Sequence, residues 1–169
     1  LRGVLVYPMM ILHIDVGRDR SISAIEQSIA DEGFIFLATQ KDTGIENPDP
    51  DDLYEIGTLA FVKSMTELPN GTYRVLIEGI ERAEWSKYEE TEKYSTVKVT
   101  SAADAEDKDI EMEALMRTLL THFGNYAKIS KKIKKETFET VAEIAEPGRL
   151  ADTITSHLPL TIEAKQEVL

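Results

Sequence analysis

Residues 57–85 read Gly57-Thr-Leu-Ala-Phe-Val-Lys-Ser-Met-Thr-Glu-Leu-Pro-Asn-Gly-Thr-Tyr-Arg-Val-Leu-Ile-Glu-Gly-Ile-Glu-Arg-Ala-Glu-Trp85. Two runs of β-forming residues flank Asn70 and Gly71 in this stretch. Both of these residues tolerate the positive φ angles that a tight hairpin turn requires. Pro69 has no backbone donor and is therefore expected at the end of a strand rather than inside it. The stretch predicts a β-hairpin, and the rest of the fold is built around it.

The second run of the hairpin has apolar residues on both of its faces. Val75 and Ile77 share one face because side chains alternate along a strand, and Leu76 lies on the other. A strand that is apolar on both sides is typical of a small barrel or of a covered sheet. After Gly79 the apolar pattern changes phase at Ile80, and a glycine at such a point predicts a bulge or a sharp bend.

The composition of the whole chain limits its possible partners. The chain has 169 residues, of which 42% are hydrophobic, enough for one ordinary domain or two small ones. Its 31 acidic and 19 basic residues give a net charge of −12, which opposes binding to nucleic acid. Cysteine is absent, which excludes disulfides and thiolate chemistry and is compatible with a reducing cytoplasm. No apolar run is long enough to predict a membrane span.

The N-terminal part reads as further strands and one helix. Strands are expected at 4–7, 10–16, 34–39 and 94–100, and the apolar run at 34–39 is continuous and predicts a buried strand. Residues 21–29 have helical spacing, with Asp19 placed to cap the helix and Gly33 to stop it. An acidic loop is expected at 42–52.

The pattern changes to helical after residue 101. Apolar stripes with a period of 3.6 are expected at 112–126, at 138–145 before Pro147-Gly148, and at 150–158 before Pro159. Thr161 can cap a fourth helix. We therefore predict an α+β protein with a β-rich barrel domain over 1–101 that carries one helix, and a helical subdomain over 102–169 that is cut at its C-terminus.

Motifs of catalysis are not found. The sequence has no Gly-rich phosphate loop and no Gly-x-Ser-x-Gly elbow, and His13, His122 and His157 are isolated. The acidic loop alternates like the start of a calcium loop. Asp52, however, stands where such a loop needs glycine, and Thr58 stands where it needs a bidentate Glu. We therefore predict no catalytic, cofactor-binding or metal-binding residues in this chain.

The basic run at 128–135 is the only positive patch in the sequence. One interpretation is that these lysines complement the dipole at the C-terminus of a helix. The other is contact with acidic neighbours in a larger assembly.

A candidate binding surface is formed by apolar residues close to the predicted turns. These residues are Pro8, Met9, Met10, Met65 and Leu68. Methionine is flexible and polarizable, so exposed methionines suit surfaces that accept varied apolar sequences. The alternative is that the five residues fill the core beneath the turns.

Several segments resemble the N-terminal domain of the Lon family of ATP-dependent proteases. In the β-rich part these are Leu1-Arg-Gly-Val-Leu-Val-Tyr-Pro8, Asp15-Val-Gly-Arg18, Phe36-Leu-Ala-Thr-Gln40, Ile56-Gly-Thr58, Leu68-Pro-Asn-Gly-Thr72 and Val75-Leu-Ile-Glu-Gly-Ile-Glu-Arg-Ala83. In the helical part they are Lys128-Ile-Ser-Lys-Lys-Ile133, Pro147-Gly-Arg-Leu-Ala-Asp152 and Ser156-His-Leu-Pro-Leu160. The segments recur in order over nearly the whole chain.

The resemblance implies a PUA-like β-barrel followed by a small helical bundle, with the ATPase and Ser-Lys peptidase domains missing downstream. It implies a cytoplasmic, non-catalytic part of a protease that recognises unfolded or degron-bearing proteins and supports a homohexamer. ATP and Mg would then bind outside this chain, and the chain itself would need no cofactor. PUA-like barrels elsewhere bind RNA, which the net charge opposes here. The alternative is a free-standing adaptor with the same barrel and no protease attached.

Overall fold

The computed structural model describes residues 1–102, 110–130 and 132–169, and the chain separates into two compact units. The first unit is Leu1–Ala103 together with Leu169, and the second is Asp104–Val168. Strands and one α-helix build the first unit, and helices build the described part of the second, so the predicted α+β class is confirmed. The polar and acidic composition of residues 102–109 suits a linker or a helix entry, but only Ala102 of this stretch lies within the described residues.

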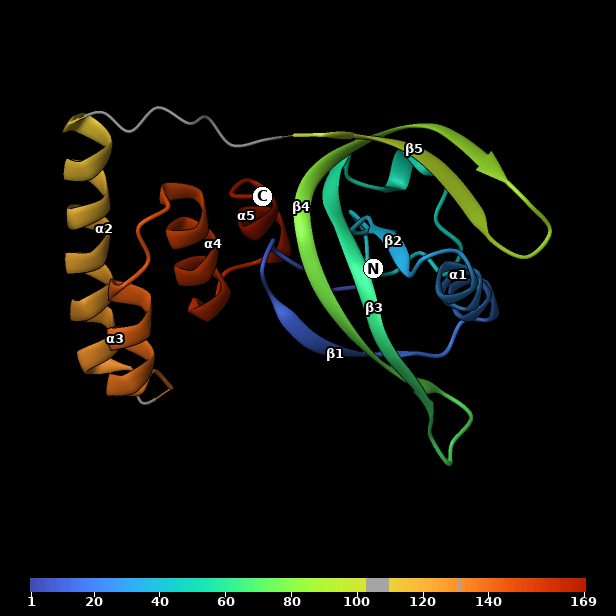
Figure 1. The fold of residues 1–169 in the computed structure, drawn as a ribbon, viewed down its shortest axis with the longest axis horizontal. Coiled ribbons are helices and arrows are strands. Elements are labelled where there is room, and N and C mark those ends of the chain that lie inside the picture. Colours follow the sequence, from blue (N-terminus) through green and yellow to red (C-terminus); the bar gives the residue numbers. More distant parts are fainter. Residues whose placement is uncertain (103–109, 131) are drawn as a thin grey trace. The chain divides into compact units, whose positions relative to one another are not determined.

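The first unit is an antiparallel sheet that curves strongly around its core (Figure 1). Its elements are β1 (Ile11–Val16), α1 (Asp19–Ala30), β2 (Phe34–Leu37), the 3₁₀ turn η1 (Pro50–Asp52), β3 (Ile56–Glu67), β4 (Tyr73–Glu90) and β5 (Ser95–Ser101). The strand order is β1-β4-β3-β2, and β5 also pairs with β4. The long strand β4 therefore organises the sheet: it pairs with β3 along one edge, and with β1 and then β5 along the other.

The predicted hairpin joins β3 to β4, but its turn differs from the expected one. The Leu68 N–H donates to Thr72 O at 2.8 Å, and the Gly71 N–H donates to Leu68 O at 2.9 Å. The positive φ of this turn belongs to Gly71 (79°) and not to Asn70. This is a type I turn followed by a left-handed glycine, in which Pro69 supplies the fixed φ of the second turn position. The expectation of a positive φ at Asn70 was wrong, because the loop is one residue longer than a two-residue turn.

The predicted bulge after Gly79 is confirmed. Ala60 pairs with Gly79 and Leu59 with Glu81, so Ile80 has no partner on β3. At the same point the turn before β1 meets β4: the Gly79 N–H donates to Met10 O at 2.9 Å, and the Met9 N–H donates to Gly79 O at 2.8 Å. A Cβ on Gly79 would lie 2.3 Å from Tyr7 O, so only glycine permits this approach.

The expected strand at 4–7 is not a strand. Residues 5–7 are buried, but side-chain hydroxyls take the place of a strand partner there. The Thr39 hydroxyl donates to Val4 O at 3.1 Å, and the buried Thr58 hydroxyl donates to Val6 O at 2.5 Å. The segment therefore closes the core without joining the sheet. The core residues of the unit are Val6, Ile14, Val16, Ile25, Leu37, Ala60, Val62, Val75 and Ile77.

Two further expectations for this unit need correction. The strand expected at 34–39 is shorter (β2) and is not buried throughout, because β2 pairs only with β3 and leaves Phe34 48% exposed. Helix α1 begins at Asp19, and Arg18 occupies the N-cap position without a side-chain cap. Asp19 therefore lies in the first turn, where a carboxylate complements the helix dipole instead of capping. The Gly33 N–H donates to Ser28 O at 2.7 Å, so the helix does end there.

The second unit contains α2 (Ile110–Ile129), α3 (Lys135–Ala142), α4 (Pro147–His157) and α5 (Ile162–Gln166). Its core residues are Phe123, Ile133, Val141, Leu150 and Ile154. Pro147 was expected to close the second helical stripe, but it begins α4, since its fixed φ suits the first turn of a helix. The predicted cap of the last helix is confirmed, because the Ala164 N–H donates to the Thr161 hydroxyl at 3.3 Å.

Candidate functional site

In the described part of the chain, the acidic and histidine side chains do not gather into one site. No group of three or more His, Cys, Asp or Glu side chains there could hold a metal ion. The carboxylates of the acidic loop serve the local turn instead: the Asp49 N–H donates to Asp52 Oδ2 at 2.9 Å. The His157 ring stacks on Phe123 with 6.3 Å between the ring centroids. None of the helices described is long and apolar enough to cross a membrane.

The five apolar residues predicted as a binding surface lie in two separate groups. Pro8, Met9 and Met10 form the turn that meets Gly79, whereas Met65 is on β3 and Leu68 is in the hairpin turn. Leu68 pairs with Thr72, and Gly79 lies seven positions after Thr72 along the chain. At ~3.3 Å per residue, this is about 23 Å along the strand. The residues therefore do not form one continuous patch.

The three methionines among these residues also differ in exposure. Met10 and Met65 are half-buried and pack against the core of the first unit. The Met10 sulfur accepts from the Tyr7 N–H at 3.4 Å. Met9, in contrast, is 58% exposed. Met10 and Met65 thus pack part of their surface against the core, and Met9 is the most exposed of the three methionines.

A larger apolar surface crosses the outer face of the sheet next to Met9. Strand pairing aligns Ile11 of β1 with Glu78 of β4, Glu78 with Phe61 of β3, and Phe61 with Phe34 of β2. We call these four aligned residues the outer row. With strands ~4.8 Å apart, the row is about 14 Å long. Its two ends are open to solvent, since Ile11 is 58% and Phe34 48% exposed. The Phe34 and Phe61 rings meet edge to face, with centroids 5.4 Å apart.

The charges along the outer row are paired within the sheet. Lys63 Nζ lies 2.6 Å from Glu78 Oε2 at the middle of the row. Ile80, two residues beyond Glu78 on the same strand, is 41% exposed and lengthens the apolar surface toward Met9. The row is therefore an apolar surface with its one carboxylate neutralised.

A bidentate ion pair bounds the same face of the sheet. Arg74 donates from Nε to Asp15 Oδ1 at 2.8 Å and from Nη2 to Asp15 Oδ2 at 2.9 Å. These hydrogen bonds, together with the positive charge of Arg74, hold the pKa of Asp15 below its ordinary value. Asp15 is thus a fixed anion at neutral pH, and its charge is balanced by its cross-strand neighbour.

The sequence-based prediction missed Ile11, Phe34 and Ile80. It expected the second hairpin strand to be covered on both faces and the strand at 34–39 to be buried, whereas Ile11, Phe34 and Ile80 are at least 41% exposed. One signal was available. The strand at 10–16 places Ile11 on the polar face with His13 and Asp15, and an isoleucine on a polar face is a candidate contact residue.

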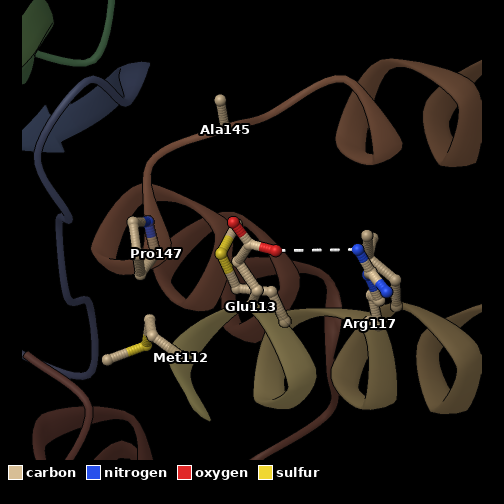
Figure 2. Close-up of a pocket in the computed structure, with 7 residues that line it drawn as sticks. Met112, Glu113, Arg117, Ala145 and Pro147 are labelled. Atoms are coloured by element: carbon tan, nitrogen blue, oxygen red, sulfur yellow. Dashed lines mark ion pairs between the residues drawn. The ribbon is translucent and has the colours of Figure 1, made fainter. Parts of the chain in front are cut away.

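The helical unit contains a small apolar hollow, and Figure 2 shows residues that line it. Its volume is about 270 Å³, and its lining includes Met112 and Met116 from α2 and Pro147 from the start of α4. At its rim Glu113 and Arg117 form an i,i+4 ion pair, with 3.6 Å between Oε2 and Nη2 (Figure 2). The two methionines give this hollow an adaptable wall.

Comparison with protein-family models assigns this chain to a family. The model for the substrate-binding domain of ATP-dependent protease La (Lon) matches residues 1–169. The chain belongs to this family. The resemblance noted in the sequence is therefore confirmed over residues 1–169.

Individual relatives agree with this assignment. The chain is 56% identical over 169 residues to a Lon protease of Bacillus thuringiensis (strain Al Hakam), covering all of this chain and 21% of the relative. It is 53% identical to Lon protease 1 of Bacillus subtilis (strain 168), covering 22% of that protein. The chain thus spans about a fifth of the length of these relatives.

A solved structure shows the same fold. The N-terminal domain of a Mycobacterium avium complex Lon protease has a TM-score of 0.74 and 22% sequence identity, over 99% of this chain and 84% of the other. Since the identity is low, this likeness concerns the fold alone. It covers both the sheet and the helices.

Proposed function

We propose that this Lon domain is the non-catalytic, substrate-engaging N-terminal part of an ATP-dependent serine protease that degrades misfolded and regulatory proteins. In this proposal it binds unfolded or degron-bearing polypeptides in the cytoplasm and supports a homohexamer. ATP, Mg and the Ser-Lys dyad belong to other parts of the protein. The family assignment supports this role, as does the protease named in relatives that are about five times longer than this chain.

The observation that carries the proposal is the outer row. Unfolded polypeptides differ from folded ones in exposing apolar side chains, and an exposed apolar surface on a folded domain marks a site of interaction. Ile11 and Phe34 present such a surface at the two ends of the row. Because the central Glu78 is already paired with Lys63, an incoming chain need not neutralise it.

We assign contact with the polypeptide to Met9, Ile11, Phe34, Phe61 and Ile80, next to Pro8 and Met10. The hairpin group, Met65 and Leu68, is a second and separate contact in this proposal. Leu68 is half-buried at the end of the hairpin, about 23 Å along the strand from the first group, so one extended segment of about seven residues could touch both.

The test is a binding titration with outer-row variants. Ile11→Ser and Phe34→Ser remove apolar surface that is already exposed, so the fold is expected to tolerate both changes. Ile29→Ser is the matched control, because Ile29 is 50% exposed but lies on α1 outside the row. The proposal requires weaker binding of a permanently unfolded protein by the Ile11→Ser and Phe34→Ser variants and unchanged binding by the control. Equal binding by all three variants would remove the row from the site.

The hairpin contact has a separate test. Leu68→Ser should weaken binding of the same unfolded protein. The midpoint of unfolding of the Leu68→Ser domain itself should change no more than it does for a typical surface substitution. Met65→Ser also weakens core packing. The binding of unfolded protein by this variant is therefore compared only after the midpoint of its own unfolding has been measured. Unchanged binding by Leu68→Ser would take the hairpin end out of the proposal.

A further inference from the structure

The basic run noted in the sequence borders a second hollow, which the outer row does not involve. This hollow lies between α2 and α3, has a volume of about 440 Å³, and has three lysines on its rim: Lys128, Lys134 and Lys135. We call it the lysine hollow.

The floor of the lysine hollow is apolar. Leu120 of α2, Ile133 of the connection and Phe138 of α3 line it. Ile133 is 8% exposed, and Gly124 leaves space for the Phe138 ring, since a Cβ there would lie 3.1 Å from Phe138 Cε2. The floor is thus fixed by core packing and can accept an apolar side chain from another molecule.

Interaction with the helix dipole explains one of the three rim lysines but not the other two. Lys128 is in the last turn of α2, where a cation complements the dipole as the sequence suggested. Lys134, however, is the N-cap of α3 and makes no side-chain cap, and Lys135 is the first residue of that helix. Cations at this end oppose the helix dipole, and Lys is not a favoured N-cap residue. Neither capping nor the helix dipole therefore gives a reason for these two lysines.

The rim charge is also largely uncompensated within the part of the chain that the structure describes. There, neither Lys128 nor Lys134 has an ion-pair partner, and Lys135 pairs only with Glu139, at 3.3 Å and with both side chains exposed. A cluster of lysines with so few ion-pair partners is unusual in a chain with a net charge of −12. Electrostatic complementarity therefore selects an anionic partner.

We propose that the lysine hollow binds a client polypeptide segment in which an apolar side chain is flanked by Asp or Glu. The apolar side chain occupies the floor at Phe138, and the carboxylates meet Lys128, Lys134 and Lys135. The inference rests on the proposed function and narrows it to a class of substrate sequence. An inorganic polyanion has no apolar group to fill the floor, and the net charge opposes the dense phosphates of nucleic acid.

Three labelled peptides that differ only in their flanking residues test this site by fluorescence anisotropy. They share one central Leu-Phe pair, flanked by Asp/Glu, by Asn/Gln or by Lys. The proposal requires the acidic peptide to bind most tightly and to lose affinity when the Leu-Phe pair is replaced by Ser-Ser. Its binding should also weaken as the salt concentration rises. Equal binding of the acidic and the basic peptide would overturn the proposal. So would two results obtained together: inorganic polyphosphate displaces the acidic peptide, and the Ser-Ser peptide binds as tightly as its parent.

Two charge-matched double variants identify the location. Lys128→Gln with Lys134→Gln should raise the Kd of the acidic peptide about five- to tenfold, as expected for two partly exposed ion pairs. Lys93→Gln with Lys98→Gln changes the net charge equally on the β-rich unit and should leave the Kd within about twofold. Equal effects of the two pairs would refute the site. If the lysine variants have no effect while outer-row variants still weaken binding of unfolded protein, this inference fails and the proposed function stands.

Discussion

The substitution Gly79→Ala tests the junction on which the first unit depends. The new Cβ would lie 2.3 Å from Tyr7 O, where an ordinary van der Waals contact is at least 3.4 Å, so the Tyr7 carbonyl must move by about 1 Å. That movement breaks the two hydrogen bonds between Gly79 and residues Met9 and Met10, at about 1 kcal/mol each. Overpacking adds roughly 1–3 kcal/mol. We expect a total loss of about 3–5 kcal/mol in the free energy of unfolding.

Urea unfolding followed by tryptophan fluorescence measures this loss. Trp85 is the only tryptophan in the chain and lies on β4, with its Nε1–H donating to Tyr54 O at 2.8 Å, so it reports on the sheet. With an m value of about 1.5 kcal/mol/M, the urea midpoint should fall by roughly 2–3 M. Gly44→Ala is the control, because its Cβ would meet only the Asp42 side chain, and its effect should stay within about 0.5 kcal/mol. A loss below about 1 kcal/mol for Gly79→Ala would refute the close approach.

Three further changes probe separate features. Thr58→Val leaves the buried Val6 carbonyl without its donor and should cost about 1–3 kcal/mol by the same urea assay; no loss would mean that the hydroxyl is dispensable. Leu150→Ala, at a fully buried position in the helical core, should cost about 3 kcal/mol by circular dichroism, and a cost under about 1 kcal/mol would contradict that burial. Arg74→Met should raise the pKa of Asp15 in a carboxyl NMR titration, since Arg74 lowers that pKa in the folded state. The stabilisation from the Arg74–Asp15 pair is present above the pKa of Asp15 in the unfolded chain, about 3.9, and is lost as the pH falls through the lower pKa of Asp15 in the folded state. An unchanged titration of Asp15 in the variant would contradict the pair.

Local rules predicted the hairpin, the bulge and most helices, because each depends on a few neighbouring residues. The Asn70-Gly71 turn, the phase change at Gly79 and the Thr161 cap are of this kind. Two of the details that were wrong are local: Asn70 has no positive φ, and Asp19 does not cap its helix. Others depend on distant partners. Residues 4–7 have strand-like composition, yet Thr39 and Thr58, far along the chain, take the Val4 and Val6 carbonyls by side-chain hydrogen bonds.

The candidate site was harder to predict for the same reason. The outer row is an alignment of β1, β4, β3 and β2, and the pairing of Ile11 with Glu78 or of Phe34 with Phe61 follows from strand register. No spacing along the chain reveals it. Closeness to the predicted turns and the adaptability of methionine brought Met10 and Met65 into the prediction, and both pack partly against the core. The lysine run was visible in the sequence, but its relation to Phe138 depends on the packing of α2 and α3.

The most direct test of the substrate-engaging role is a titration of this chain with a labelled, permanently unfolded protein and with the folded form of the same protein, at two salt concentrations. We predict selective binding to the unfolded form, with little salt dependence at the apolar outer row, and weaker binding after Ile11→Ser and Phe34→Ser but not after Ile29→Ser. Equal binding to folded and unfolded forms, or no binding to either, would contradict a substrate-engaging surface in this chain.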